Sequence, residues 1–266
     1  MAADTNSMGA LRSKINLSLH TYHATKAWWG RNAESGKPPI IGMRQFLFLA
    51  GAVQRNVTRD DPYADHWMLL IDEKLAEVRA KLDEAMADAE ALLEQIPSEL
   101  AIEENVNQQP FTTPVYTGGQ QGWLALRLLI DFDRLARNIL LATHVALMTR
   151  RDSARFLEAV NHEIRSLCAF PARYPGYSGV TRDDFAANNA KAREAREKFG
   201  ELPEDVLKGT RRSPYAPDIQ KPQQSVATSG PVTAAGPATE TEDKVETESS
   251  GGKESAMGDG STIKQT

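Results

Sequence analysis

The 266-residue sequence predicts a mainly α-helical fold, in which several helices surround one long central helix. Three patterns predict it: an uninterrupted apolar stretch at 120–148, a heptad spacing of apolar residues between 71 and 96, and a short alternation at 14–20. The domain is expected to span residues 12–218, with an N-terminal strand at about 14–20. Residues 1–11 and 219–266 are expected to be disordered, because the tail has almost no large apolar residue to bury.

Residues 120–148 form the predicted central helix. They contain no proline, and their single glycine, Gly122, falls in the first turn. As one helix they would be about 44 Å long. Apolar residues fall on almost every face, so other helices must cover it. A membrane span is not expected, because charged groups are costly in lipid. The charged residues of this stretch are Arg127, Asp131, Asp133, Arg134 and Arg137.

A second long helix is predicted before it. Asp60-Asp61-Pro62 provides an N-cap followed by a proline in the first turn, and Pro97 ends the helix after Ile96. Its apolar residues repeat at spacings of four and three, which is a heptad seam. The seam residues are Ile71, Leu75, Val78, Leu82, Ala85, Ala89, Leu92 and Ile96. Core packing is the favoured interpretation, and a dimer seam stays open.

The remaining segments are shorter. Helical patterns are expected at 22–31, 40–57, 153–169, 181–200 and 203–207, with a variant capping box at Thr181. The net charge of −5 is unevenly distributed. Residues 1–59 hold eight Lys or Arg against two Asp or Glu, whereas residues 60–104 hold three against fourteen. A basic N-terminal segment is a weak indication of a polyanion-binding end.

The alternating segment is the clearest strand. Its apolar residues Ile15, Leu17 and Leu19 predict one buried face. A single strand cannot satisfy its own backbone, and the sequence offers no equally good partner nearby. The same strand of a second subunit is one solution, and residues 112–117 are a second candidate ribbon.

The polar side chains of this strand suggest a nucleic-acid contact. In the ribbon-helix-helix architecture, an antiparallel ribbon enters the major groove and its polar side chains meet base edges. The candidate base contacts are Lys14, Asn16, Ser18 and His20. The candidate phosphate contacts are Arg12, Lys26, Arg31, Lys37 and Arg44. From periodicity alone, an edge strand with a solvated polar face is the stronger interpretation.

Enzyme chemistry is not indicated. No catalytic constellation, phosphate loop or zinc-ligand spacing is present, so no cofactor and no metal are expected. One cysteine, Cys168, excludes an internal disulfide and fits a reducing compartment. The first residues carry no secretory signal pattern, which favours a cytoplasmic protein.

Five runs of residues resemble a known family. They are L-H-T-Y-H-A-T-K-A-W-W-G-R (19–31), I-I-G-M (40–43), D-D-P-Y-A-D-H-W-M-L (60–69), Y-S-G-V-T-R-D-D-F-A-A-N (177–188) and L-P-E-D-V-L-K-G-T-R-R-S-P-Y-A-P (202–217). They are similar to an integrating conjugative element protein family that is related to the AcaB transcriptional activators of conjugative plasmids. The resemblance implies a bacterial mobile element, control of conjugation genes and an atypical ribbon-helix-helix DNA-binding part.

The sequence therefore predicts a homodimeric bacterial activator of transfer genes that binds double-stranded DNA, with RNA polymerase as a further partner. The alternative is a non-enzymatic helical structural or adaptor protein of the conjugation machinery, which would use the heptad seam as its interface.

Overall fold

A computed structural model describes residues 13–33, 37–103, 105–117 and 119–219. Arg12 and the segments expected to be disordered, 1–11 and 219–266, lie outside these residues, except for residue 219. Helices dominate the described part of the chain, which confirms the mainly α-helical prediction. None of these helices is long and apolar enough to cross a membrane.

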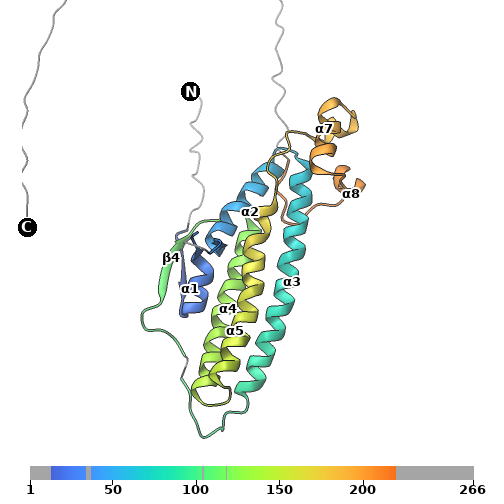
Figure 1. Cartoon of the computed structure of the whole chain (residues 1–266). Coiled ribbons are helices and arrows are strands. Elements are labelled where there is room, and N and C mark those ends of the chain that lie inside the picture. The colour runs from blue at the N-terminus through green and yellow to red at the C-terminus, as the bar shows by residue number, and fades with distance from the viewer. Residues whose placement is uncertain (1–12, 34–36, 104, 118, 220–266) are drawn as a thin grey trace, which may run out of the picture. The chain divides into compact units, whose positions relative to one another are not determined.

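Four helices form the main bundle: α2 (Met43–Val57), α3 (Pro62–Leu93), α4 (Gln120–His144) and α5 (Arg150–Ala169). Figure 1 shows α3, α4 and α5 running side by side over most of their length. The helix α4 contacts α1 (Tyr22–Trp29), α2, α3 and α5, and Leu129, Phe132 and Leu135 on it are fully buried. The predicted central helix is therefore confirmed.

The C-terminal end of α4 comes earlier than the sequence predicts. The helix ends at His144, with Val145 as its cap and Ala146 in the left-handed region at φ +61°. The Leu147 amide then donates to the Ala142 carbonyl at 2.9 Å, as in a Schellman motif. Because an alanine occupies the position that glycine usually takes, the sequence gives no sign of this stop.

The predicted N-terminus of α3 is confirmed. The Asp61 carboxylate accepts hydrogen bonds from the amides of Tyr63 and Ala64, at 2.9 and 3.3 Å, and Pro62 lies in the first turn. Six heptad residues are buried in the main core, where α3 packs against α2, α4 and α5. They are Ile71, Leu75, Val78, Leu82, Ala85 and Ala89. These positions pack within the chain, so the seam does not offer the adaptor alternative an open interface.

The N-terminal strand is confirmed, and one of its two candidate partners pairs with it. β1 (Ile15–Leu19) pairs antiparallel with β4 (Phe111–Val115), and the register sets Leu17 opposite Thr113. The second candidate segment of the same chain, at 112–117, therefore completes a two-stranded ribbon without a second subunit. Leu17, Leu19 and Val115 join the main core, which fixes the ribbon against the bundle.

A second small hairpin connects the first two helices. β2 (Gly30–Arg31) follows α1 (Tyr22–Trp29) and pairs with β3 (Ile40–Ile41) just before α2. Gly30 has φ +70°, and a Cβ there would lie 2.1 Å from the Ile40 carbonyl oxygen. A Cβ on Gly42 would lie 2.4 Å from the Gly30 nitrogen, so both positions require glycine. The backbones of the W-W-G-R and I-I-G-M runs thus pass each other in close contact at Gly30 and Gly42.

The last described segment packs against the first turns of α3. It contains the 3₁₀ helix η1 (Phe170–Arg173) and the short helices α6 (Arg182–Ala186), α7 (Ala190–Phe199) and α8 (Glu204–Leu207). The capping box at Thr181 is confirmed, but the helix expected over 181–200 is broken by Asn188 at φ +45°. A second apolar cluster forms here from Tyr63, Val180, Phe185, Ala192, Ala195 and Leu202.

Candidate nucleic-acid interface

The β1–β4 ribbon presents one polar face to solvent. Residues directly opposite each other in an antiparallel pair lie on the same face, and Asn16 is opposite Pro114 while Ser18 is opposite Thr112. All four are exposed, and the hydroxyls of Ser18 and Thr112 lie 3.4 Å apart. We call this surface, with the exposed neighbours at its end, the ribbon face. It consists of Lys14, Asn16, Ser18, Thr112, Pro114 and Tyr116.

The opposite end of the ribbon is held by His20. Its side chain is half-buried, and the Nδ1 atom accepts a hydrogen bond from the Asn107 amide at 3.1 Å. The Asn107 side chain also lies 3.5 Å from the His20 carbonyl. His20 is a predicted base contact, and in this structure its ring also holds the segment that leads into β4.

A buried carboxylate of the central helix anchors the junction between β1 and α1. Asp133 accepts the Thr21 amide and the Thr21 hydroxyl, both at 2.8 Å, and the His20 amide at 3.1 Å. The same Thr21 hydroxyl accepts the Ala24 amide and so caps α1. Arg137 lies one turn further along α4, with its Nε atom 3.8 Å from the Asp133 carboxylate. Asp133 therefore fixes the position of the ribbon and of α1 relative to α4.

From the sequence alone, Asp133 is one of five charged residues on the predicted central helix. A single aspartate among apolar residues is compatible with a solvated position, and its partners are more than a hundred residues earlier in the chain. A usable signal was its place on the apolar side of the helix, between Phe132 and Leu135. Buried charges need partners, so that position predicts a hydrogen-bonding role.

The region that carries the ribbon is basic, and its positive charges are not neutralised by ion pairs. The described residues between 13 and 59 include seven Lys or Arg and no Asp or Glu. None of the seven forms an ion pair within the described part of the chain. They are Lys14, Lys26, Arg31, Lys37, Arg44, Arg55 and Arg59. Unpaired cations of one sign give a positive local potential that attracts polyanions.

Several arginines in the rest of the chain are paired with carboxylates. Arg79 binds Asp131 at 2.7 Å, and Arg212 binds the fully buried Asp65 at 3.1 Å. Glu158 of α5 lies close to Lys26. The hydrogen bond from Arg165 is the main cause that lowers the pKa of the Glu158 carboxyl, and the charge of Lys26 lowers it further. Lys26 therefore marks the margin of the uncompensated area.

The structure places the predicted phosphate contacts in different surroundings. Lys26 and Lys37 are exposed on α1 and in the β2–β3 connection. Arg31 is half-buried and donates to the Pro38 carbonyl at 2.9 Å, so it also holds its own loop. Arg44 is exposed, with its guanidinium 5.6 Å from the centre of the Trp29 ring. Arg12 lies outside the described residues.

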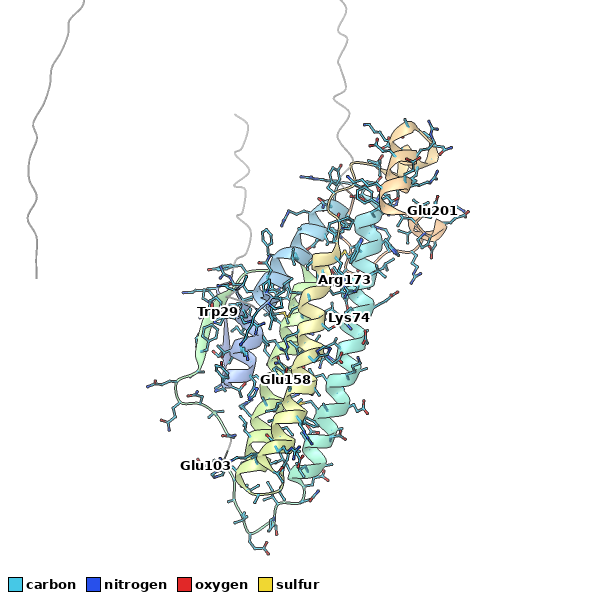
Figure 2. All side chains as sticks on the ribbon, in the orientation of Figure 1. Trp29, Lys74, Glu103, Glu158, Arg173 and Glu201 are labelled. Carbon is cyan, nitrogen blue, oxygen red and sulfur yellow. The ribbon has the colours of Figure 1, made fainter. Side chains whose placement is uncertain are left out.

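Trp29 links these cations to the ribbon. Its ring packs edge-on against Phe111 of β4 at 5.7 Å between centroids, and Figure 2 shows it beside that strand. Lys14, Asn16 and Ser18 thus share the ribbon face, and Arg44 is brought to its flank through Trp29. The sequence indicated the segment 112–117 as a candidate ribbon but assigned no contact to its side chains; the pairing with β4 sets Thr112 opposite Ser18, and exposed Tyr116 follows the last paired residue, Val115.

The other motif runs have a structural role. Asp61 accepts hydrogen bonds from the amide and hydroxyl of Ser178, both at 2.8 Å. Arg182 pairs with Asp60 and with Asp65. The runs at 60–69, 177–188 and 202–217 therefore meet in one ion-pair network at the start of α3. Among the described residues, no group of three or more His, Cys, Asp or Glu side chains is arranged to hold a metal.

Comparisons with known proteins identify the family. No curated protein matches the chain significantly. A crystal structure of AcaB from uropathogenic E. coli aligns with 75% of this chain and 98% of that chain, at 15% sequence identity and a TM-score of 0.49. The family model described as transcriptional regulator AcaB matches residues 7–220. The chain therefore belongs to the AcaB family of transcriptional regulators.

Proposed function

We propose that this protein binds double-stranded DNA through the ribbon face and activates conjugative transfer genes of an integrative and conjugative element. The observation that carries the proposal is an exposed polar ribbon, fixed to the bundle on its other side, within a region of unpaired cations. Membership of a regulator family supports DNA as the polyanion and gives no support to catalysis.

The ribbon face suits the major groove. That groove admits a two-stranded ribbon, and side chains on one face of it meet base edges. The Asn16 amide matches the donor and acceptor pair of adenine, and the Lys14 ammonium matches the acceptors of guanine. The Ser18 and Thr112 hydroxyls both donate and accept, so they can address either kind of base. A well-placed bidentate contact discriminates by about 1–3 kcal/mol.

The cations beside the ribbon would contact phosphates. Lys26, Lys37 and Arg44 are exposed, and none of them forms an ion pair among the described residues, although Lys26 lies near enough to Glu158 to lower the pKa of that carboxyl. Each phosphate contact releases condensed counterions, so three contacts give a log–log slope of affinity against salt of about −2.7 per protomer. Arg31 would contribute less, because its guanidinium already serves the Pro38 carbonyl.

A ribbon that is complete within one chain changes the role of the proposed homodimer. Each protomer would insert its own ribbon, and two protomers would read two half-sites related by the dimer axis. The operator is then expected to be a two-fold repeat, with its half-sites spaced by about one helical turn or a multiple of it. Contact with RNA polymerase would turn this binding into activation.

The test is a gel-shift assay on promoter fragments of the host element at two salt concentrations. We expect retention of particular fragments that weakens steeply with salt. The variant Arg44→Gln should lower the salt slope, whereas Arg151→Gln, an exposed arginine at the start of α5, should leave it unchanged. Co-purification with transfer-machinery proteins without any DNA retention would instead support the adaptor alternative.

A further inference from the structure

An open groove of about 900 Å³ lies between α2 and β4, beside the end of α1. Thirteen residues line it, and none of them carries a carboxylate. Pro114 and Tyr116 belong both to this groove and to the ribbon face, so the two surfaces share a border. Nothing in the proposed base or phosphate contacts requires a hollow of this size.

The α2 wall of the groove is a single helical stripe. Arg44, Phe48, Gly51, Arg55 and Thr58 all line it, at successive spacings of four, three, four and three residues. This spacing keeps side chains on one face of a helix, and it is the spacing along which a second helix packs. Within the part of the chain that the structure describes, the stripe is therefore a helix-packing surface that no other helix covers, and it faces β4 across the groove.

Gly51 leaves a gap at the middle of the stripe. A Cβ atom built on it would meet only the Arg55 Nη1 atom within 4 Å, at 3.5 Å. The wall beside Phe48 is consequently hollow where every other heptad position carries a side chain. A large apolar side chain from a partner would fill this hollow and cover the Phe48 ring.

The rim of the groove combines exposed aromatic rings with cations. Trp29, Phe48 and Tyr116 are 52%, 63% and 78% exposed. Aromatic and arginine side chains of this kind supply most of the binding energy at protein interfaces. Arg44 and Arg55, at either end of the stripe, have no ion pair among the described residues.

We propose that the groove binds an acidic amphipathic helix of a protein partner. Arg44 and Arg55 are eleven residues apart on α2, or roughly 16 Å at 1.5 Å per residue. A partner helix would place carboxylates about three turns apart against these two guanidinium groups. Between them it would present large apolar residues to Phe48, Gly51 and Tyr116. The proposal does not depend on DNA binding; because Arg44 is assigned to both surfaces, the helix and a DNA phosphate would compete for that side chain.

Two other occupants fit less well. A small molecule is normally enclosed over most of its surface, but the rings of Phe48 and Tyr116 are largely open to solvent. A single nucleic-acid strand carries a charge at every nucleotide. The α2 stripe offers cations only at its two ends, with an apolar centre between them.

The experiment is a display selection with the full-length protein as bait. The probe is a library of 15-residue amphipathic helices in which the apolar stripe is kept and all polar positions are randomised between Glu, Lys and Gln. A parallel selection uses Gly51→Leu, which fills the hollow. Leucine has a higher helix propensity than glycine, and the Cβ clears the backbone, so this variant keeps α2 folded.

We expect the wild-type bait to enrich helices with Glu near both ends, and the Gly51→Leu bait to enrich none of them. The best helix should bind at least tenfold more weakly to Phe48→Ala and to Arg55→Gln. It should bind equally well to the matched surface variants Ile130→Ala and Arg127→Gln on α4. Operator binding should be unchanged in Gly51→Leu and Phe48→Ala, which separates this surface from the ribbon.

Enrichment of Lys-rich or uncharged helices, or equal enrichment by both baits, would overturn the proposal. So would a selected helix that loses no affinity for Phe48→Ala. Displacement of the selected helix by oligothymidylate, with affinities of similar size for both, would assign the groove to single-stranded nucleic acid instead. Any of these results would leave the proposed DNA-binding function standing, because that function rests on the ribbon face.

Discussion

Removal of the Asp133 carboxylate should detach the β1–α1 junction from the central helix. In Asp133→Ala, the Thr21 amide and the Thr21 hydroxyl lose their shared acceptor, and Thr21 is itself buried. A buried donor left unsatisfied costs about 1–3 kcal/mol, so two of them give a loss of about 3 kcal/mol in the free energy of unfolding. The variant should still fold at 25 °C, since domains of this kind are stable by about 5–15 kcal/mol.

The control is Asp131→Ala, two residues earlier on the same helix. Asp131 also has two partners, Arg79 at 2.7 Å and Arg134 at 3.2 Å, but all three side chains are partly exposed. Solvent screens such pairs, so the expected loss is below about 1 kcal/mol. Urea unfolding followed by circular dichroism gives both values from the shift in midpoint at constant m-value.

Asp133→Asn provides an intermediate case. It keeps one acceptor oxygen for Thr21 and should cost about 1 kcal/mol. Equal losses of unfolding free energy for Asp133→Ala and Asp131→Ala, or a loss below about 1 kcal/mol for Asp133→Ala, would show that the Asp133 carboxylate does not anchor the β1–α1 junction. Operator affinity should also fall in Asp133→Ala at urea-free conditions, because the ribbon would no longer be held in one position against α4.

Three further outcomes are expected. Asp65→Ala should cost about 3–5 kcal/mol in urea unfolding, because it leaves two arginines without their buried partner, whereas Glu73→Ala at an exposed pair should cost less than about 0.5 kcal/mol. Burial raises the pKa of the Cys168 thiol to about 12, so iodoacetamide at pH 8 should label it only as fast as the chain unfolds, and rapid labelling in native buffer would contradict the burial. Truncation after residue 217 should leave the urea midpoint within error of the full chain, and a lost cooperative transition would reject that domain boundary.

Patterns within a short stretch of sequence predicted the helices and strands whose ends and buried faces are set by neighbouring residues. The Asp61-Pro62 start of α3, six of its eight heptad positions and the burial of Leu17 and Leu19 in β1 come from neighbouring residues, and the structure has each of them. In contrast, α3 ends at Leu93 instead of Ile96, and Ile15, expected on the buried face, is 43% exposed. The strand that pairs with β1 was harder to predict from the sequence than β1 itself. β4 contains Pro114 and two threonines, and it lies more than ninety residues away in the chain, so its pairing depends on where the bundle brings it.

The candidate interface was predictable only in part, for the same reason. The polar residues of β1 were found from period-two alternation, because that side of the ribbon is encoded in one segment. Thr112 joins them only through the register with β4, and Tyr116 follows the end of that strand. The groove beside α2 depends on Gly51 facing β4, which no local pattern indicates. His20 lost part of its predicted role because a distant segment, at Asn107, uses its ring.

The proposed function requires that side chains of the ribbon face contact base edges and so recognise the DNA sequence. The most direct measurement compares the operator preferences of the wild type and Asn16→Ala, by selection from randomised duplexes followed by titration at two salt concentrations. We expect Asn16→Ala to lose discrimination at one base pair per half-site, by about 5- to 150-fold, with an unchanged salt slope. Identical base preferences and affinities in the two proteins would contradict the claim and place the DNA contact elsewhere on the molecule.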